Sequence, residues 1–432
     1  FSSASMDLKL QYAVHQGKYK LVRELIEAKA NIETKDVCDM TPLMVAAREG
    51  YATSTKILIQ AKANLEAKTR NGMTPLLAAA DAGQTECVQL LIDAKANLES
   101  KNNQGVTPLV ATVVGDHTAC AQALIAAKAK IEAKEEKGRT PLLLAVAANH
   151  SASAKVLLDA KANLEVKIAN GFTPLLAAVN NKCLECVRIL IDAKANIEAR
   201  DESDYTALHI AAATKNAECV QALLDAKANI EARTDGKLTP LIAAADARSP
   251  ECMRLILRAG ANIEARARNG ATPLLASVYK GDPACLKVMI EAKADIETKL
   301  LSGSTPLILA AYEDHVDCIQ VLIDAKANIE ARGKNEVTSL MMAAGQGHVD
   351  CLRCLIDAKA NLEAKKTKGH TALHRAVTEG QMQCAWALLD AKADIDAKAA
   401  SGETALTMAR RAGEQEIVDL LLEAQNVGCP PY

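Results

Sequence analysis

The sequence predicts an all-α solenoid of about 13 stacked units, each a helix-turn-helix followed by a β-hairpin loop, and three observations support this fold class. A Thr, followed by Pro in eight of twelve cases, recurs every 33 residues from Thr41 to Thr404 without insertion or deletion. Half of the residues are apolar but only 2% are aromatic, which is typical of helices that pack through small side chains. The decapeptide IDAKANIEAR at 191–200 returns unchanged at 323–332.

Each unit is predicted to begin with a short helix. Thr is a favoured N-cap and Pro suits the first helical position, as in TPLLAAA from Thr74. Gly or a polar residue nine positions after the Thr, such as Gly83, is expected to end this helix. A second helix follows, as in TECVQLLIDA from Thr85, with apolar residues at i, i+3 and i+4. The segment EAKTRNGM at 66–73 then predicts an extended hairpin with a Gly-containing turn.

These units resemble the ankyrin repeat. The T-P-L-H-x-A-A stretch of that family is present as TALHIAA at Thr206 and as TALHRAV at Thr371, and other units replace the His with Leu, Ile, Val, Met or Thr. The resemblance extends over essentially the whole chain. It implies the ankyrin fold, a role as a binding scaffold, and partner contacts along a concave face made by the hairpin tips and the exposed side of each first helix.

The chain departs from the ankyrin pattern after the second helix, where the family usually has Gly in a left-handed conformation. Only Gly260 keeps that residue, and Lys stands at the other eleven positions. A non-Gly residue in this conformation costs roughly 1 kcal/mol, and a cation at a helix C-terminus recovers about 0.3–1 kcal/mol. Because the two effects nearly cancel, the substitution is tolerable. The lysines are Lys29, Lys62, Lys95, Lys128, Lys161, Lys194, Lys227, Lys293, Lys326, Lys359 and Lys392.

The period also sets the expected domain boundaries. We expect a divergent N-terminal capping unit at 5–36, eleven internal repeats at 37–399 and a C-terminal capping repeat at 400–425. An irregular tail is expected at 426–432. The two capping units are expected to present polar residues at their outer faces, because solenoids need polar ends for solubility.

The decapeptide either carries chemistry or forms a structural joint, and its charges favour a joint. An acid lies eight residues before every Thr, from Glu33 to Asp396, and a base lies six residues before it, as at Lys35. With the lysine row and nearby acids, these rows carry 23 positive and 21 negative charges. We therefore interpret them as a self-neutralising, solvated surface rather than a polyanion track. Nucleic-acid binding would require an uncompensated basic face with stacking aromatics.

Composition limits the other classes of function. The formal net charge is −2, and no apolar run reaches the ~18 residues that span a bilayer, so no membrane insertion is expected. The first residues, FSSASMDLKLQ, lack the basic start and apolar stretch of a secretory signal. Thirteen cysteines without a disulfide pattern favour an intracellular, reducing location such as the cytoplasm.

No motif indicates an enzyme, a cofactor, a metal site or a small-molecule substrate. Two CxxC pairs, Cys183 with Cys186 and Cys351 with Cys354, lack a second pair at zinc-finger spacing. The histidines fit turn and helix hydrogen bonding better than catalysis, and no P-loop, G-x-S-x-G or H-E-x-x-H is present. Nine cysteines stand thirteen residues after the Thr and are predicted to be small buried apolar residues: Cys87, Cys120, Cys186, Cys219, Cys252, Cys285, Cys318, Cys351 and Cys384.

A partner protein is expected to bind where the repeats differ from one another, one residue before and seven residues after each Thr. Rigid aromatics at such positions on an Ala-rich surface are favoured as binding hot spots. The alternative is ordinary exposed tyrosines, with a Phe that packs on the next hairpin. The residues predicted to contact a partner are Phe172, Tyr205, Leu238, Tyr279 and Tyr312.

Two hypotheses for function follow. In the first, the chain is a non-enzymatic scaffold that binds a partner protein along the concave face. In the second, it is the ankyrin portion or a structural subunit of a larger assembly, such as a channel, a kinase or a multi-subunit complex. The intact mass of the native protein would separate them. The sequence leaves the partner unnamed.

Overall fold

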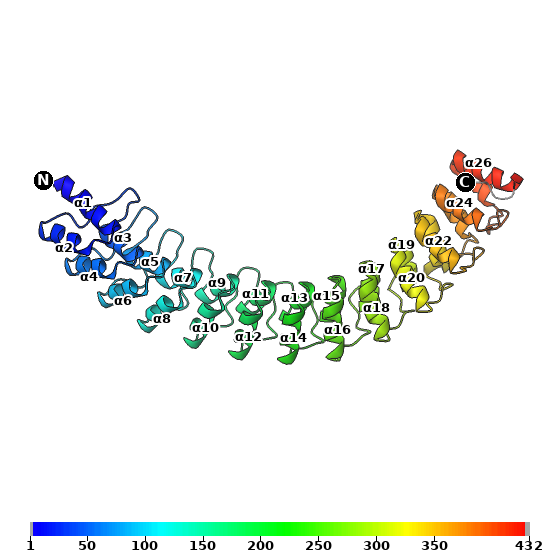
Figure 1. Ribbon diagram of the computed structural model, residues 1–432. Helices are drawn as coiled ribbons and strands as arrows, with labels where there is room; N and C mark the ends of the chain where they lie inside the picture. Colours follow the sequence, from blue (N-terminus) through cyan, green and yellow to red (C-terminus); the bar gives the residue numbers. More distant parts are fainter. Residues whose placement is uncertain (1–2, 428–432) are drawn as a thin grey trace. The chain divides into compact units, whose positions relative to one another are not determined.

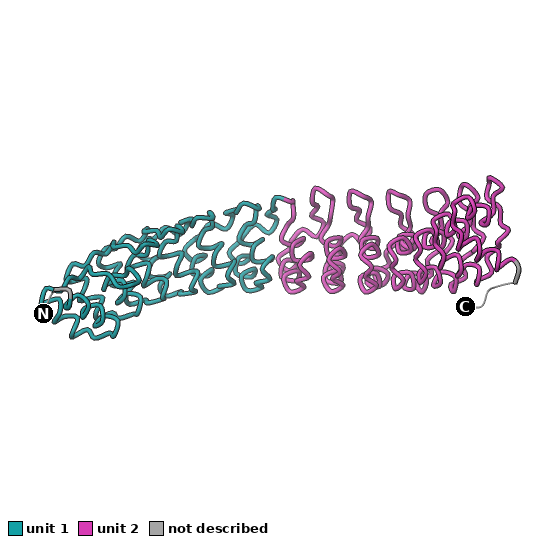
Figure 2. Tube along the Cα trace, turned by 90° about the horizontal axis from the view of Figure 1, so that it is seen from above, with its two compact units in different colours: residues 1–202 teal, residues 203–432 magenta. Residues whose placement is uncertain are grey.

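The computed structural model describes residues 3–427, and these form helix pairs that keep the predicted 33-residue period (Figure 1). The chain divides into two compact units, residues 1–202 and residues 203–432 (Figure 2). Each internal pair joins a seven- or eight-residue first helix to a nine-residue second helix.

Within residues 3–202, the first unit has six helix pairs. Its helices are α1 (Ser3–His15), α2 (Tyr19–Glu27), α3 (Pro42–Arg48), α4 (Ala52–Gln60), α5 (Pro75–Asp81), α6 (Thr85–Asp93), α7 (Pro108–Val114), α8 (Thr118–Ala126), α9 (Pro141–Ala147), α10 (Ser151–Asp159), α11 (Pro174–Asn180) and α12 (Leu184–Asp192).

Over residues 203–427, the second unit has seven helix pairs and one 3-10 turn, η1 (Lys334–Glu336). Its helices are α13 (Ala207–Ala213), α14 (Ala217–Asp225), α15 (Pro240–Asp246), α16 (Pro250–Arg258), α17 (Pro273–Tyr279), α18 (Pro283–Glu291), α19 (Pro306–Tyr312), α20 (Val316–Asp324), α21 (Ser339–Gln346), α22 (Val349–Asp357), α23 (Ala372–Thr378), α24 (Met382–Asp390), α25 (Ala405–Ala412) and α26 (Gln415–Val427).

The helices of each unit lie in two layers, and the core runs between them. Within each compact unit, first helices contact the first helices of adjacent repeats, as α3 contacts α5, and second helices do the same, as α4 contacts α6. The first helices are nearly all buried; in α5 every residue from Pro75 to Ala80 is enclosed. The small Ala side chains allow this close packing.

The predicted helix caps are confirmed. In ten of the 33-residue repeats the Thr Oγ1 accepts the backbone N–H three residues later at 3.3–3.5 Å, as Thr74 does from Leu77. In the two repeats with a TALH stretch, at Thr206 and Thr371, the Thr hydroxyl instead pairs with the His ring; Thr206 Oγ1 lies 2.9 Å from His209 Nδ1. His209 Nε2 bonds the Leu238 carbonyl of the next unit at 3.0 Å, so these histidines are buried structural residues.

The conformations after both helices are also confirmed. Gly83 ends its first helix with φ +71°, and all eleven lysines that replace the family Gly have φ between 62° and 70°. The backbone therefore accepts Lys where Gly is usual, as the balance of strain and helix dipole predicts.

The hairpins form loops rather than β-strands. No strand is present among residues 3–427. The loops close by short turn bonds, such as Asp36 N–H to the Met40 carbonyl at 2.9 Å, and neighbouring tips share a backbone bond, such as Asn103 N–H to Asn71 O at 3.0 Å. One bond per junction is too few to build a ladder of strands. Figure 2 shows the hairpins of residues 203–432 projecting from the helices.

The acidic row of the decapeptide joins neighbouring repeats through hydrogen bonds. Glu33 Oε1 accepts the Asn64 N–H of the next repeat at 2.8 Å, and the same bond recurs along both units at 2.7–2.8 Å. The Asn64 Oδ1 in turn accepts the N–H of Glu66 at 2.9 Å. We call this chain of contacts the acid ladder. It confirms that the decapeptide is a joint.

The basic row forms a parallel set of contacts. Lys35 Nζ donates to the carbonyl of Lys68, one period later, at 3.0 Å, and equivalent Lys or Arg side chains do so at 2.9–3.4 Å. The interpretation of these rows as mutually neutralising, solvated charges was therefore incomplete. Ten carboxylates of the acidic row and nine side chains of the basic row bind a backbone group of the next repeat.

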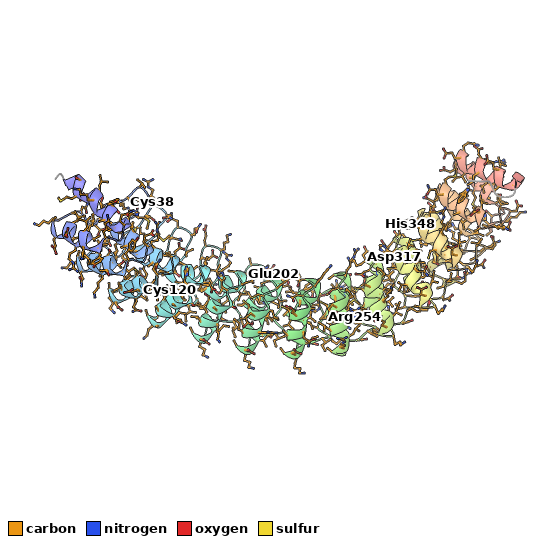
Figure 3. The ribbon with its side chains drawn as sticks, viewed as in Figure 1. Cys38, Cys120, Glu202, Arg254, Asp317 and His348 are labelled. Atoms are coloured by element: carbon orange, nitrogen blue, oxygen red, sulfur yellow. The ribbon has the colours of Figure 1, made fainter. Side chains whose placement is uncertain are left out.

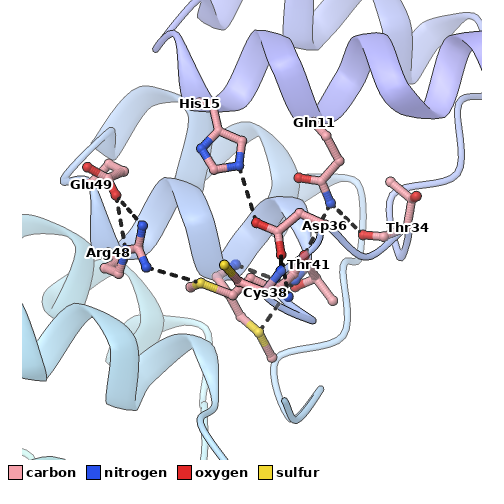
Figure 4. Close-up of polar contacts among 10 residues, drawn as sticks. Gln11, His15, Thr34, Asp36, Cys38, Thr41, Arg48 and Glu49 are labelled. Carbon is pink, nitrogen blue, oxygen red and sulfur yellow. Dashed lines mark hydrogen bonds and ion pairs between the residues drawn. The ribbon is translucent and has the colours of Figure 1, made fainter. Parts of the chain in front are cut away.

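The N-terminal pair packs on the first hairpin through polar contacts (Figure 4). Gln11 Nε2 donates to the carbonyls of Thr34 at 2.7 Å and Met40 at 3.2 Å, and His15 Nε2 lies 3.2 Å from Asp36 Oδ2. The outer face of α1 is less polar than expected, because Leu8 is 74% exposed and Tyr12 is 57% exposed.

The C-terminal helix runs further than expected. α26 continues to Val427, two residues into the segment 426–432 that was predicted to be irregular. No Gly or Pro interrupts the sequence before Gly428, so nothing in it breaks the helix earlier. Residues 428–432 lie outside the described residues.

Candidate functional site

The residues predicted to bind a partner lie where the hairpins meet the first helices. Tyr279 and Tyr312, at the ends of α17 and α19, are 53% and 47% exposed, and they are among the few large apolar side chains so exposed. Phe172, Tyr205 and Leu238 lie at hairpin ends and are half-buried. The first helices otherwise carry mainly small or enclosed side chains.

Leu238 and Tyr279 come together in one pocket of about 330 Å³ in residues 203–432. One wall is the exposed side of α15 and α17, and the other comes from hairpin residues such as Leu300. Tyr205 and Tyr312 lie outside this lining, and Phe172 belongs to the other unit. The pocket lining is Leu238, Ile242, Asp246, Ala267, Asn269, Ala271, Leu275, Ala276, Tyr279, Lys280, Leu300 and Leu309.

Two opposite charges stand at the pocket. Asp246 is open to solvent, yet the surrounding pocket wall desolvates its carboxyl and raises its pKa, while the Lys280 ammonium partly offsets that effect. The Lys280 Nζ lies 5.3 Å from the centre of the Tyr279 ring, within the range of a cation–π contact. The site thus combines an apolar floor, an aromatic ring, an acid and a base, a combination typical of a binding pocket.

Sequence reasoning passed over Asp246 and Lys280. Asp246 stands at a variable position, seven residues after its Thr, but the choice of candidates favoured aromatic residues. A comparison of charge at that position would have found it. Lys280 follows Tyr279 at the end of α17. Only the folded structure shows that Asp246 and Lys280 line the same pocket.

A family model for ankyrin repeats matches the chain at residues 10–102, 93–168, 160–234, 241–332, 276–366, 307–399 and 340–430. The chain belongs to the ankyrin-repeat family. A search of curated proteins found no match to this ankyrin chain. Ankyrin repeats are generally protein-interaction modules, so the coarse class of function follows from membership.

Nine cysteines of this ankyrin protein are buried, as predicted for the position that they share. The nine that share one phase are at most 1% exposed, whereas Cys38 is exposed (Figure 3). Burial raises the pKa of the Cys285 and Cys318 thiols to about 12, with nearby Asp282 adding to the effect. These thiols stay protonated and unreactive.

The CxxC pairs do not assemble a metal centre in the ankyrin fold. Cys183 is the N-cap of α12, and its sulfur accepts the Cys186 N–H at 3.4 Å. Cys354 lies on the outer face of α22 while Cys351 is buried. Within residues 3–427 no group of three or more His, Cys, Asp or Glu side chains is placed to hold a metal ion.

Four further histidines, His117, His150, His315 and His348, join ankyrin repeats. His117 Nε2 lies 3.1 Å from the Asp81 carbonyl and His348 Nδ1 lies 3.0 Å from the Ala311 carbonyl, each in the preceding repeat. This confirms the hydrogen-bonding interpretation. None of the helices in the described part of the chain has the length and apolar character to cross a bilayer.

Proposed function

We propose that this ankyrin protein is a non-enzymatic scaffold that binds a partner protein along the face made by its first helices and hairpins, with the Leu238–Tyr279 pocket as an anchor point. The observation that carries the proposal is the pocket itself, where two predicted binding residues share one concavity. A polypeptide side chain that is apolar along its length fits between Leu238 and Tyr279. A donor at its end meets the Asp246 carboxylate.

Tyr279 and Tyr312 differ from the small side chains on the rest of this face. Tyr supplies a large rigid contact area at small entropic cost, and truncation of such an anchor commonly costs more than 2 kcal/mol of binding free energy. The Ala-rich positions around Tyr279 and Tyr312 provide complementarity but little energy. Strong affinity would therefore depend on few residues.

The experiment is affinity capture followed by direct affinity measurement with the purified partner. The double variant Tyr279→Ala, Tyr312→Ala and the single variant Leu238→Ala are compared with the native protein. Tyr19→Ala is the matched control, because Tyr19 is 44% exposed but lies on α2, a second helix. We expect the double variant to weaken binding by about 30-fold or more, while Tyr19→Ala leaves it unchanged. Equal recovery and equal affinity for all four proteins would overturn the proposal.

We also infer that the protein works in a reducing compartment, most simply the cytoplasm. The lack of a disulfide among the cysteines of residues 3–427 supports this. Microscopy of the tagged native protein tests it, and a location in an oxidising compartment would contradict it.

A further inference from the structure

A second concavity lies on the opposite layer, where the second helices α22, α24 and α26 stand side by side (Figure 1). It is a groove of about 750 Å³. Met382 and Trp386 of α24 and Leu420 of α26 supply its apolar surface. We call it the Trp386 groove.

Trp386 differs in type from the residues at the equivalent position of the other repeats. It is the only Trp in the chain, and it stands fifteen residues after its Thr. Ten of the eleven equivalent positions hold Lys, Arg or Gln, such as Lys155, Arg254 and Gln320. That row lies on the solvent side of the second helices, and Trp386 is only half-buried there. Packing between repeats does not require an aromatic residue, because the other repeats stack without one.

The charge around Trp386 is strongly one-sided. Four carboxylates line the groove: Asp350, Glu416, Asp419 and Glu423. All four are exposed. The single base in the lining, Arg353, lies with its guanidinium 5.8 Å from the centre of the Trp386 ring. The groove therefore presents an apolar aromatic floor inside an acidic rim.

We propose that the Trp386 groove is a second binding surface, which takes a positively charged segment of another protein and seats an apolar side chain of that segment against Trp386. Charge complementarity selects this occupant, because a net excess of carboxylates attracts Lys and Arg and repels nucleic acid and anionic lipid. The apolar floor supplies the anchor that charges alone do not. The surface is independent of the Leu238–Tyr279 pocket, which lies on the other helix layer.

The test uses a fluorescein-labelled 14-residue peptide of Lys and Leu with leucines three and four residues apart, and a twin with Glu in place of Lys. Fluorescence anisotropy measures affinity. In the native protein the single Trp gives an independent signal from the groove itself. Three variants are compared with it: Trp386→Gln, which places a residue that other repeats use, the pair Glu416→Gln with Glu423→Gln, and the control pair Glu218→Gln with Asp317→Asn. The control removes the same charge from exposed sites on α14 and α20.

The Lys peptide is expected to bind saturably and change the Trp386 emission, and the Glu twin is expected to do neither. Trp386→Gln should weaken binding by about tenfold or more and the groove pair by about fivefold, with the control pair within twofold of native. Three results would overturn the proposal: no saturable binding of the Lys peptide below about 1 mM, equal weakening by the control pair, or native affinity in Trp386→Gln. A native protein that dimerises through Trp386, seen as a concentration-dependent mass that Trp386→Gln abolishes, would also overturn it.

Discussion

Removal of one side chain from the acid ladder should loosen a single joint between repeats. Glu330 Oε1 accepts the Asn361 N–H at 2.7 Å, and Asn361 Oδ1 accepts the Glu363 N–H at 2.9 Å. A hydrogen bond to a charged group contributes about 1.5–3 kcal/mol when enclosed. Because Glu330 is partly open to water, we expect Glu330→Ala to cost about 1–1.5 kcal/mol. Glu330→Gln keeps the shape and a neutral acceptor, so it should cost about half as much.

Hydrogen exchange at the Asn361 amide reports this joint directly. A loss of about 1.4 kcal/mol corresponds to tenfold faster exchange when local opening controls the rate, so Glu330→Ala should speed exchange about tenfold and Glu330→Gln about threefold. Glu379→Ala serves as a control, because Glu379 is exposed and lies outside the ladder. Exchange at Asn361 that stays at the native rate in Glu330→Ala would refute the ladder as a source of stability.

Three further outcomes are expected. A Cβ at Gly83 would lie 2.5 Å from the next repeat's imidazole, whereas one at Gly413 meets no atom within 4 Å; both have positive φ. Gly83→Ala should therefore lower the free energy of unfolding, measured with denaturant, by more than the roughly 1 kcal/mol expected for Gly413→Ala, and equal losses would contradict this. Brief iodoacetamide labelling should modify exposed Cys38 long before Cys285, whose buried thiol has its pKa raised to about 12; equal labelling rates by mass spectrometry would be inconsistent with that burial. Burial lowers the pKa of His374 below 6.5, so its contribution to stability is present above pH 6.5 and is lost as the pH falls toward the folded-state pKa. His374→Leu should flatten that loss in denaturant titrations between pH 7 and 5, and an unchanged slope would count against it.

The repetitive part of the fold was predictable because the same helix-capping and turn residues recur in most repeats. Thr at the N-cap, Gly83 at the end of a first helix and Lys194 after a second helix all adopt the expected conformations. Each depends only on near neighbours in the chain. The phase of the buried cysteines was predictable for the same reason, since one helix face recurs twelve times.

The joints and the sites were harder to predict, because their partners lie a full period away. Charge counting found the row that contains Glu330 but not its bond to Asn361. Aromatic scarcity pointed to Tyr279 but not to Asp246 beside it. Trp386 is hard to recognise from its own repeat, because it adjoins the cysteine position and only the other repeats show that its position is usually polar. Comparison of each residue with its eleven equivalents would have identified it.

Deletion of one whole period tests the central claim most directly, namely that equivalent modules contact only their neighbours through a repeated joint. Removing residues 305–337 connects Ser304 to Thr338 and brings Asn361 to the place that Asn328 holds beside Glu297. We predict that this variant keeps native helix content per residue by circular dichroism and unfolds cooperatively. Deletion of 305–314, which removes α19 but keeps α20, leaves the apolar face of α20 without its first helix and should lose helix content well beyond the deleted residues. Equal helix content per residue in the two variants, or collapse of the in-period variant, would contradict the account.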